Sequence, residues 1–259
     1  MISALQWFVL AVCALITLLR MPAALRGENR SLFGIFLLVT VGMLLSIQWS
    51  YTLIDGFLGS NNYANLLLRY VVYATVLLAG YKIVKGFENT HSLRLLLGPV
   101  GLAALATICI ATAVPFLMAN TAGTSVGLST LPDQSGPNRQ LIALYTAAGR
   151  LYPAYVAACL LPATIKVLRS RLPRLVRGGA ALLTTGSAAM ILLPISDLLP
   201  QRLAFIQYII SLTGVLGLMV GLSLIWLGRV AARRGSRNCP SLADAHPVPG
   251  RENFAAKEL

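Results

Sequence analysis

The chain has 259 residues, of which 57% are hydrophobic and only 11% are charged, and its mean hydropathy is +0.75. Soluble domains carry roughly a quarter charged residues, so this composition excludes a soluble enzyme and a disordered chain. A formal net charge of +13 would indicate a nucleic-acid partner on a soluble protein, but the positions of the basic residues give this charge another origin.

Seven apolar stretches follow one another, each close to the ~20 residues that cross a bilayer as a helix. The first begins directly after Met1 and runs to Arg20 without a basic leader or a cleavage motif, so we expect a retained helix and not a signal peptide. We predict an all-α fold, a polytopic membrane bundle of seven transmembrane helices in residues 1–228, followed by a disordered basic cytoplasmic tail, 229–259. The predicted helices cover about 2–19, 31–53, 63–84, 95–118, 141–165, 179–199 and 203–228.

Basic residues are distributed unevenly between the two sets of predicted loops. One set and the tail hold most of them, whereas the other set holds only Arg139 and Arg202, and Arg69 and Arg150 fall inside predicted helices. The positive-inside rule therefore places the N-terminus outside and the C-terminus in the cytoplasm, with the basic face against anionic lipids and no need for nucleic acid. The residues of the basic set are Arg20, Arg26, Arg30, Lys82, Lys85, Arg94, Lys166, Arg169, Arg171, Arg174, Arg177, Arg229, Arg233, Arg234, Arg237, Arg251 and Lys257.

Similar features in the first and last three predicted helices indicate an internal repeat. Arg20 and Arg169 each end a helix shortly before a proline, and the next helix of each set ends near an acid, Asp55 or Asp197. Because the first and fifth helices start on the same side, the pattern predicts a parallel three-plus-one-plus-three duplication, a plan that transporters use. The alternative is that basic loop ends and outer acids recur by chance.

Small residues mark two further segments. Residues 119–140 are rich in Thr, Ser and Gly, and we interpret them as a flexible external connector. Near the end of the bundle a set of small residues favours close packing of the sixth and seventh predicted helices, since small residues let helix backbones approach in a membrane. The set is Gly178, Gly179, Gly186, Ser187, Gly214, Gly217 and Gly221.

The residues that membrane enzymes use are missing from the predicted spans. Both histidines, His91 and His246, lie in cytoplasmic segments, which excludes a bis-His haem site and a Ser-His protease inside the bundle. No Asp or Glu lies mid-membrane, and the four cysteines have no metal-ligand spacing. We therefore expect no catalytic residue, no metal and no cofactor, and interpret the protein as not an enzyme.

Arg69 is the most informative residue because it lies inside a predicted span, about 20 Å from the cytoplasmic boundary at Lys82 if each helical residue rises 1.5 Å. An arginine there costs several kcal/mol unless it snorkels, pairs or faces water. It therefore marks either a ligand site or an ion pair with Asp55 or Asp197 that locks helices together at the outer end.

Tyrosines gather near the two intramembrane arginines. Tyr70 and Tyr73 follow Arg69 on one predicted helix, and Tyr152 follows Arg150 on another. Two guanidinium groups with phenol donors suit a carboxylate or phosphate, so these five residues are the candidate ligand-binding set, in an outward-facing pocket. The alternatives are an aromatic belt at the membrane surface for the tyrosines and snorkelling to the interface for Arg150.

Short motifs at the helix boundaries are shared with a known family. They are Arg20-Met-Pro22, Ile54-Asp55-Gly56, Asn65, and Leu172-Pro173-Arg174-Leu175 before Gly178. Over residues 1–230 the chain resembles the membrane region of an actinobacterial family of seven-helix integral membrane proteins described as transporters, whose longer members add a C-terminal domain of unknown function. The resemblance implies transport without naming a substrate, and a location in the bacterial cytoplasmic membrane.

Three hypotheses about function remain open. In the first, the bundle transports a small, anionic solute that binds at Arg69 and the neighbouring tyrosines. In the second, an outer pocket binds a ligand and the basic cytoplasmic face binds a protein partner, as in a receptor or signalling subunit. In the third, the protein is a structural or assembly subunit whose arginines form internal salt bridges. The family resemblance favours the first.

Overall fold

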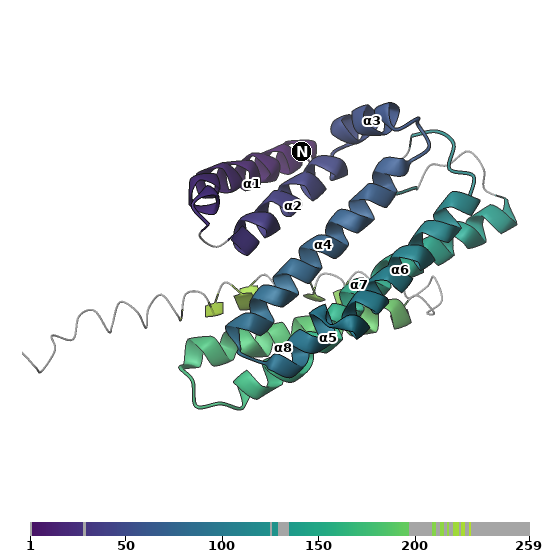
Figure 1. Ribbon diagram of the computed structural model, residues 1–259. Coiled ribbons are helices and arrows are strands. Elements are labelled where there is room, and N and C mark those ends of the chain that lie inside the picture. Colours follow the sequence, from purple (N-terminus) through teal and green to yellow (C-terminus); the bar gives the residue numbers. More distant parts are fainter. Residues whose placement is uncertain are drawn as a thin grey trace, which may run out of the picture.

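The structure, a computed structural model, describes residues 2–27, 30–124, 126–128 and 135–196 and scattered residues between 209 and 228 (Figure 1). Every longer regular element in this described part is an α-helix, which confirms the predicted all-α class, and the predicted tail lies outside it. The elements are α1 (Ile2–Leu25), α2 (Arg30–Ser46), α3 (Gln48–Phe57), α4 (Tyr63–Gly86), α5 (Thr90–Leu97), α6 (Pro99–Met118), the 3₁₀ turn η1 (Val126–Leu128), α7 (Gly136–Leu168) and α8 (Arg174–Ser196).

Four helical segments in the described part of the chain are long and apolar enough to cross a membrane: α4, the joined pair α5–α6, α7 and α8. The bent pair α2–α3 makes a fifth if it is counted as one span, and the described apolar part of α1, Leu10–Leu25, is shorter. The predicted helix 203–228 is described only in part, so seven spans remain a prediction. The four segments correspond to the predicted helices at 63–84, 95–118, 141–165 and 179–199.

The predicted single helix over 31–53 is wrong, because the chain turns sharply at Ile47. This residue is extended (φ −87°, ψ 127°), and the axes of α2 and α3 differ by 91°. Ile47 is buried, and the Ser50 hydroxyl donates a hydrogen bond of 2.7 Å to the Leu44 carbonyl, which a continuous helix would use itself. The burial of Ile47 and the Ser50 hydrogen bond therefore stabilise a helix break at a point where the sequence has no proline or glycine.

Helix α4 is the centre of the described bundle. The helices α1, α2 and α3 lie on one side of it, and α5 to α8 lie on the other (Figure 1). On this second side α7 runs beside α4 in the same direction, since Asn65 contacts Tyr145 near the start of both helices and Gly80 meets Val156 farther along. Two helices far apart in the sequence thus pack against each other at two levels.

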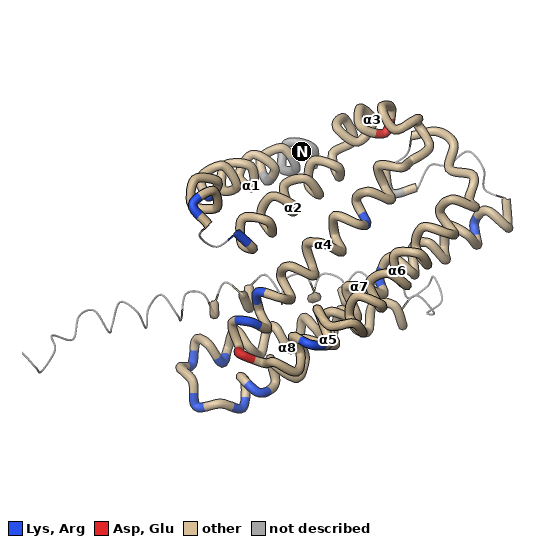
Figure 2. The backbone as a smooth tube through the Cα atoms, viewed as in Figure 1, with Lys and Arg blue, Asp and Glu red and all other residues tan. Residues whose placement is uncertain are grey.

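Lys and Arg residues gather at one end of the bundle, where α1 joins α2, α4 joins α5 and α7 joins α8 (Figure 2). The other end carries the connections from α3 to α4 and from α6 to α7, and the acidic residue on α3, Asp55, lies there. The charge asymmetry counted along the sequence is therefore also an asymmetry in space.

Gly179 and Gly186 of α8 pack closely against the described residues of segment 209–228, as predicted, whereas Gly178, which was predicted to pack there too, does not. A Cβ atom on Gly217 would lie 2.8 Å from the Cα of Gly186, and one on Gly179 would lie 2.8 Å from the Gly221 carbonyl oxygen. Real side-chain contacts are not this short, so the small residues are what allow the two backbones to approach.

Replacing Gly179 tests this packing against an adjacent control. Gly179→Leu places a side chain against Ile225 and Gly221, whereas a Cβ at Gly178 meets nothing within 4 Å. We expect Gly179→Leu to destabilise the fold by about 1–3 kcal/mol relative to Gly178→Leu, as overpacked side chains do. Thermal melting of the two purified variants in the same detergent measures the difference; equal melting temperatures would contradict the close packing.

Candidate functional site

Arg69 lies half-buried on the face of α4 that meets α7. Its guanidinium carbon is 5.3 Å from the centroid of the Tyr145 ring, a cation–π contact. A Cβ on Gly149 would lie 2.9 Å from the same carbon, so this glycine lets the guanidinium lie against the backbone of α7. Within the described residues no carboxylate is within salt-bridge distance of Arg69.

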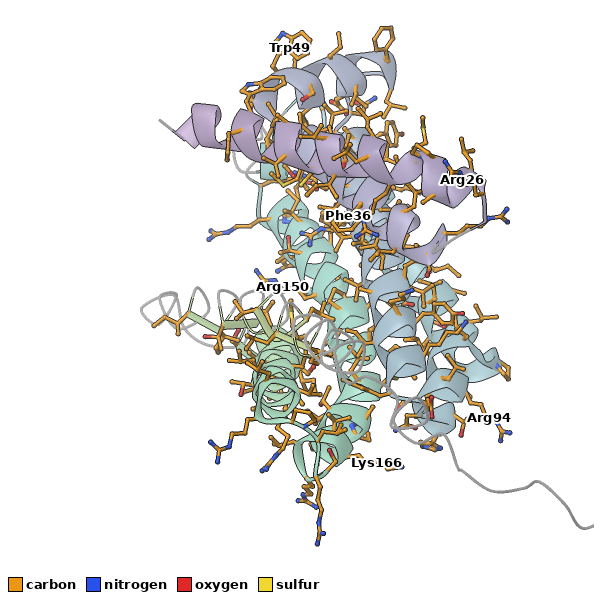
Figure 3. All side chains as sticks on the ribbon, turned by 90° about the vertical axis from the view of Figure 1, so that its left-hand side faces the viewer. Arg26, Phe36, Trp49, Arg94, Arg150 and Lys166 are labelled. Atoms are coloured by element: carbon orange, nitrogen blue, oxygen red, sulfur yellow. The ribbon has the colours of Figure 1, made fainter. Side chains whose placement is uncertain are left out.

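Arg150 follows Gly149 directly, so the structure brings both predicted arginines to the same level of the bundle. Arg150 is half-buried, and Figure 3 shows it beside α7, between α1 above and α8 below. Since the Arg69 guanidinium lies against Gly149, the two arginines are near neighbours at the α4–α7 contact. Two neighbouring guanidinium groups are able to bind an anion such as a carboxylate or phosphate.

The predicted tyrosines fall into two groups. Tyr73 and Tyr152 meet at the α4–α7 contact, with ring centroids 5.3 Å apart, and both are fully buried. The Tyr73 hydroxyl is 2.8 Å from the Thr112 hydroxyl on α6, whereas the Tyr152 hydroxyl has no hydrogen-bond partner among the described residues. Tyr70 instead turns to α6, where its hydroxyl donates to the Cys109 carbonyl at 3.2 Å.

The most direct neighbours of Arg69 were not in the predicted set. Besides Gly149 they include Tyr145, whose hydroxyl donates a hydrogen bond of 3.1 Å to the Asn65 side chain, and that asparagine is one turn before Arg69 on α4. Helical spacing could have found them, because residues four apart share a helix face. Asn65 lies four residues before Arg69 on α4, and Tyr145 lies four residues before Gly149 on α7.

Asp55 is fully buried and caps the start of α4. Its carboxylate accepts hydrogen bonds from the backbone N–H groups of Asn62 (3.1 Å) and Ala64 (3.2 Å) and from the Thr124 hydroxyl (2.9 Å). A negative charge is stabilised at this position because the first N–H groups of a helix are unpaired and positively polarised. The predicted alternative of an Asp55–Arg69 ion pair is therefore not what the structure describes, and Asp197 lies outside the described residues.

The first residues after α6 are anchored to this cap, which corrects the prediction of a flexible connector over 119–140 at its start, while residues 129–134 lie outside the described residues. The Thr121 hydroxyl donates to the Asn61 carbonyl at 2.8 Å, and the Asn62 side chain donates to the carbonyls of Thr121 and Gly123. Helix α7 also begins inside the predicted connector, at Gly136. We refer to Asp55, Asn62, Thr121 and Thr124 as the polar cap.

The described residues contain no group of three or more His, Cys, Asp or Glu side chains that could hold a metal ion. Their titratable groups near Arg69 are phenols and a second guanidinium, which donate hydrogen bonds but do not offer an anionic ligand. These described donors are able to bind an anion.

Removing the Asp55 carboxylate tests the polar cap. Asp55→Ala leaves two backbone N–H groups and a hydroxyl without their acceptor, and each unpaired buried group costs about 1–3 kcal/mol. We expect a loss of about 2–5 kcal/mol in unfolding free energy, against about 1 kcal/mol for the control Thr124→Ala, which removes one donor. Thermal or denaturant unfolding in detergent measures both; equal losses would show that the carboxylate does not cap α4.

No model of a known protein family matches the chain, and no curated protein or solved structure matches it either.

Proposed function

We propose that the protein is a multi-pass membrane protein that transports a small anionic solute, held by its carboxylate or phosphate group at Arg69 and Arg150. The observation that carries the proposal is the Arg69 guanidinium, which lies inside the bundle beside a second arginine and is not paired with a carboxylate in the described part of the chain. An intramembrane arginine of this kind is by default part of a functional site.

The surroundings of Arg69 support an anion as the ligand. A bidentate guanidinium contact to a carboxylate or phosphate is a strong charge-assisted interaction, and a second guanidinium next to it adds to the attraction. The buried Tyr152 hydroxyl, which has no partner among the described residues, supplies a further donor close to the α4–α7 contact. The proposal assigns no catalytic step, metal or cofactor to the protein.

The orientation and the location are part of the same proposal. The gathering of Lys and Arg at one end of the bundle supports a cytoplasmic position for that end, against anionic lipids, with the N-terminus outside and seven helices in the bacterial cytoplasmic membrane (Figure 2). The solute would then enter from the end that carries the polar cap. A parallel repeat of three helices is compatible with this plan.

A second candidate function is a receptor or an assembly subunit without transport. It is favoured by the same contacts, because a guanidinium stacked on Tyr145 and laid against Gly149 can join α4 to α7 without any solute. The two functions differ in whether water and anions reach Arg69.

Accessibility of position 69 separates these functions. Arg69→Cys is made in a variant without Cys13, Cys109, Cys159 and Cys239, and thiol reagents of either charge are added to the purified protein. For a wet anion site we expect the negative reagent to react faster by about tenfold, because Arg150 remains nearby, and Arg150→Gln to remove that preference. Inorganic phosphate, acetate or glutamate should slow the reaction.

The control is Tyr63→Cys, on the exposed start of α4, which both reagents should label at similar rates. If position 69 stays unlabelled in a folded protein, this result would contradict the transport proposal and favour the structural alternative.

Transport itself is measured with vesicles that contain the purified protein and are loaded with inorganic phosphate, acetate or glutamate. We expect faster release of at least one of these anions than from protein-free vesicles. Arg69→Ala should lower that rate about 10- to 100-fold, because a hydrogen bond to a charged group is worth about 1.5–3 kcal/mol. Release that is unchanged in a correctly folded Arg69→Ala protein would overturn the assignment of this residue.

A further inference from the structure

Helix α3 lies across the direction of α2. The two axes meet at 91°, and α2 has 17 residues, which span about 25 Å at 1.5 Å per residue and so nearly cross the ~30 Å hydrocarbon core by themselves. If α2 crosses the bilayer, α3 lies along the membrane surface at the end of the bundle that carries the polar cap.

The two faces of α3 are the reverse of those of a helix on a soluble protein. Ser50, Tyr51 and Asp55 are buried against the bundle, while the exposed face carries Trp49, Leu53 and Phe57, spaced four apart. The exposed fractions of Trp49 and Phe57 are 67% and 85%. A helix that turns such a stripe outward at the end of a membrane bundle is typical of a helix at the lipid–water interface, where tryptophan is enriched.

A groove of about 850 Å³ runs between α3 and the start of α1. Trp7 and Trp49 both line it and their tilted rings are in contact, with centroids 6.3 Å apart, and Leu53 and Phe57 continue its apolar lining. This volume is within the about 300–1,000 Å³ of typical ligand pockets. The apolar surface continues from the groove onto α1, where Phe8 is 66% exposed, so the groove opens onto the side of the bundle that faces lipid.

Two polar groups mark one edge of the same groove. Gln48 and Thr52 line it and are exposed, and the side-chain amide of Gln48 has no hydrogen-bond partner among the described residues. An amide can donate to a phosphate or an ester carbonyl. Among the described residues no Lys or Arg lines the groove, so the described lining offers no partner for the charge of a headgroup.

We propose that this groove binds one membrane phospholipid, with an acyl chain along Leu53 and Phe57 beside the Trp7–Trp49 ring pair and the ester or phosphate oxygens at Gln48. The proposal is independent of the anion site at Arg69, because none of the residues lining the groove belongs to α4 or α7.

Tryptophan fluorescence tests the proposal directly. In the variant Trp226→Phe, Trp7 and Trp49 are the remaining source of tryptophan fluorescence. A phospholipid with brominated acyl chains quenches the fluorescence of tryptophans that it touches. The protein is kept in detergent with a few brominated lipids for each chain, so that lipid bound at a site is detected over bulk lipid. Gly56→Leu fills the groove, since a Cβ at Gly56 meets nothing within 4 Å. The matched control is Gly136→Leu, on α7, where a Cβ also meets nothing within 4 Å.

We expect saturable quenching that Gly56→Leu reduces roughly twofold or more, because filled space excludes the chain, and that Gly136→Leu leaves unchanged. Gln48→Ala, a milder change, should raise the half-saturating lipid concentration about two- to tenfold, as expected for one lost hydrogen bond. Equal quenching in Gly56→Leu and Gly136→Leu would overturn the proposal. Quenching of the two tryptophans by acrylamide from water, and not by brominated lipid, would also overturn it. The same holds for a dimer that Gly56→Leu dissociates, since a second copy of the chain would then occupy the groove.

Discussion

The contact between α4 and α7 is the constraint on which the rest of the described structure depends. The two helices run in the same direction although residues 87–135 lie between them in the chain, and each brings a glycine to the contact: Gly149 below the Arg69 guanidinium and Gly80 against Val156. Tyr73 and Tyr152 fill the space between these two points. Because α4 also contacts α2, and α7 also contacts α6 and α8, a shift of this pair would move both sides of the bundle. The same contact brings Arg69 and Arg150 to the same level of the bundle.

The polar cap has a consequence beyond the helix that it caps. Asp55 reaches the start of α4 only if α3 turns its polar side inward, and the Tyr51 hydroxyl joins the same network by donating to the Asn62 side chain at 2.8 Å. The opposite side of α3 must then face outward with Trp49 and Phe57. A buried carboxylate and an exposed apolar stripe are thus two results of one orientation. In water the stripe would be unfavourable, whereas at a lipid boundary it is favourable, so this orientation itself supports a membrane environment.

Residues that act over short distances in the chain were predictable, and residues that act across the fold were not. The apolar periods of α4, α7 and α8 indicated their positions because a spanning helix needs only a continuous apolar segment. The break at Ile47 was missed because its cause is the burial of Ile47 and a hydrogen bond from Ser50, and neither residue is a helix breaker. The anchored residues after α6 were missed for a related reason, since their partners in the polar cap lie about sixty residues earlier in the chain.

Composition alone indicates a membrane protein, because so few charges cannot cover a water-facing surface and the basic residues are sorted between alternate loops. The amino-acid sequence also shows that Arg69 and Arg150 are unusual, because a charge within an apolar segment is conspicuous in any fold. Which groups these charges meet depends on the tertiary structure. It joined Asp55 to the N-terminus of α4 and placed Arg69 against Tyr145 and Gly149. The physical reason is that hydrophobicity is a property of each segment, whereas pairing depends on which helix faces pack together.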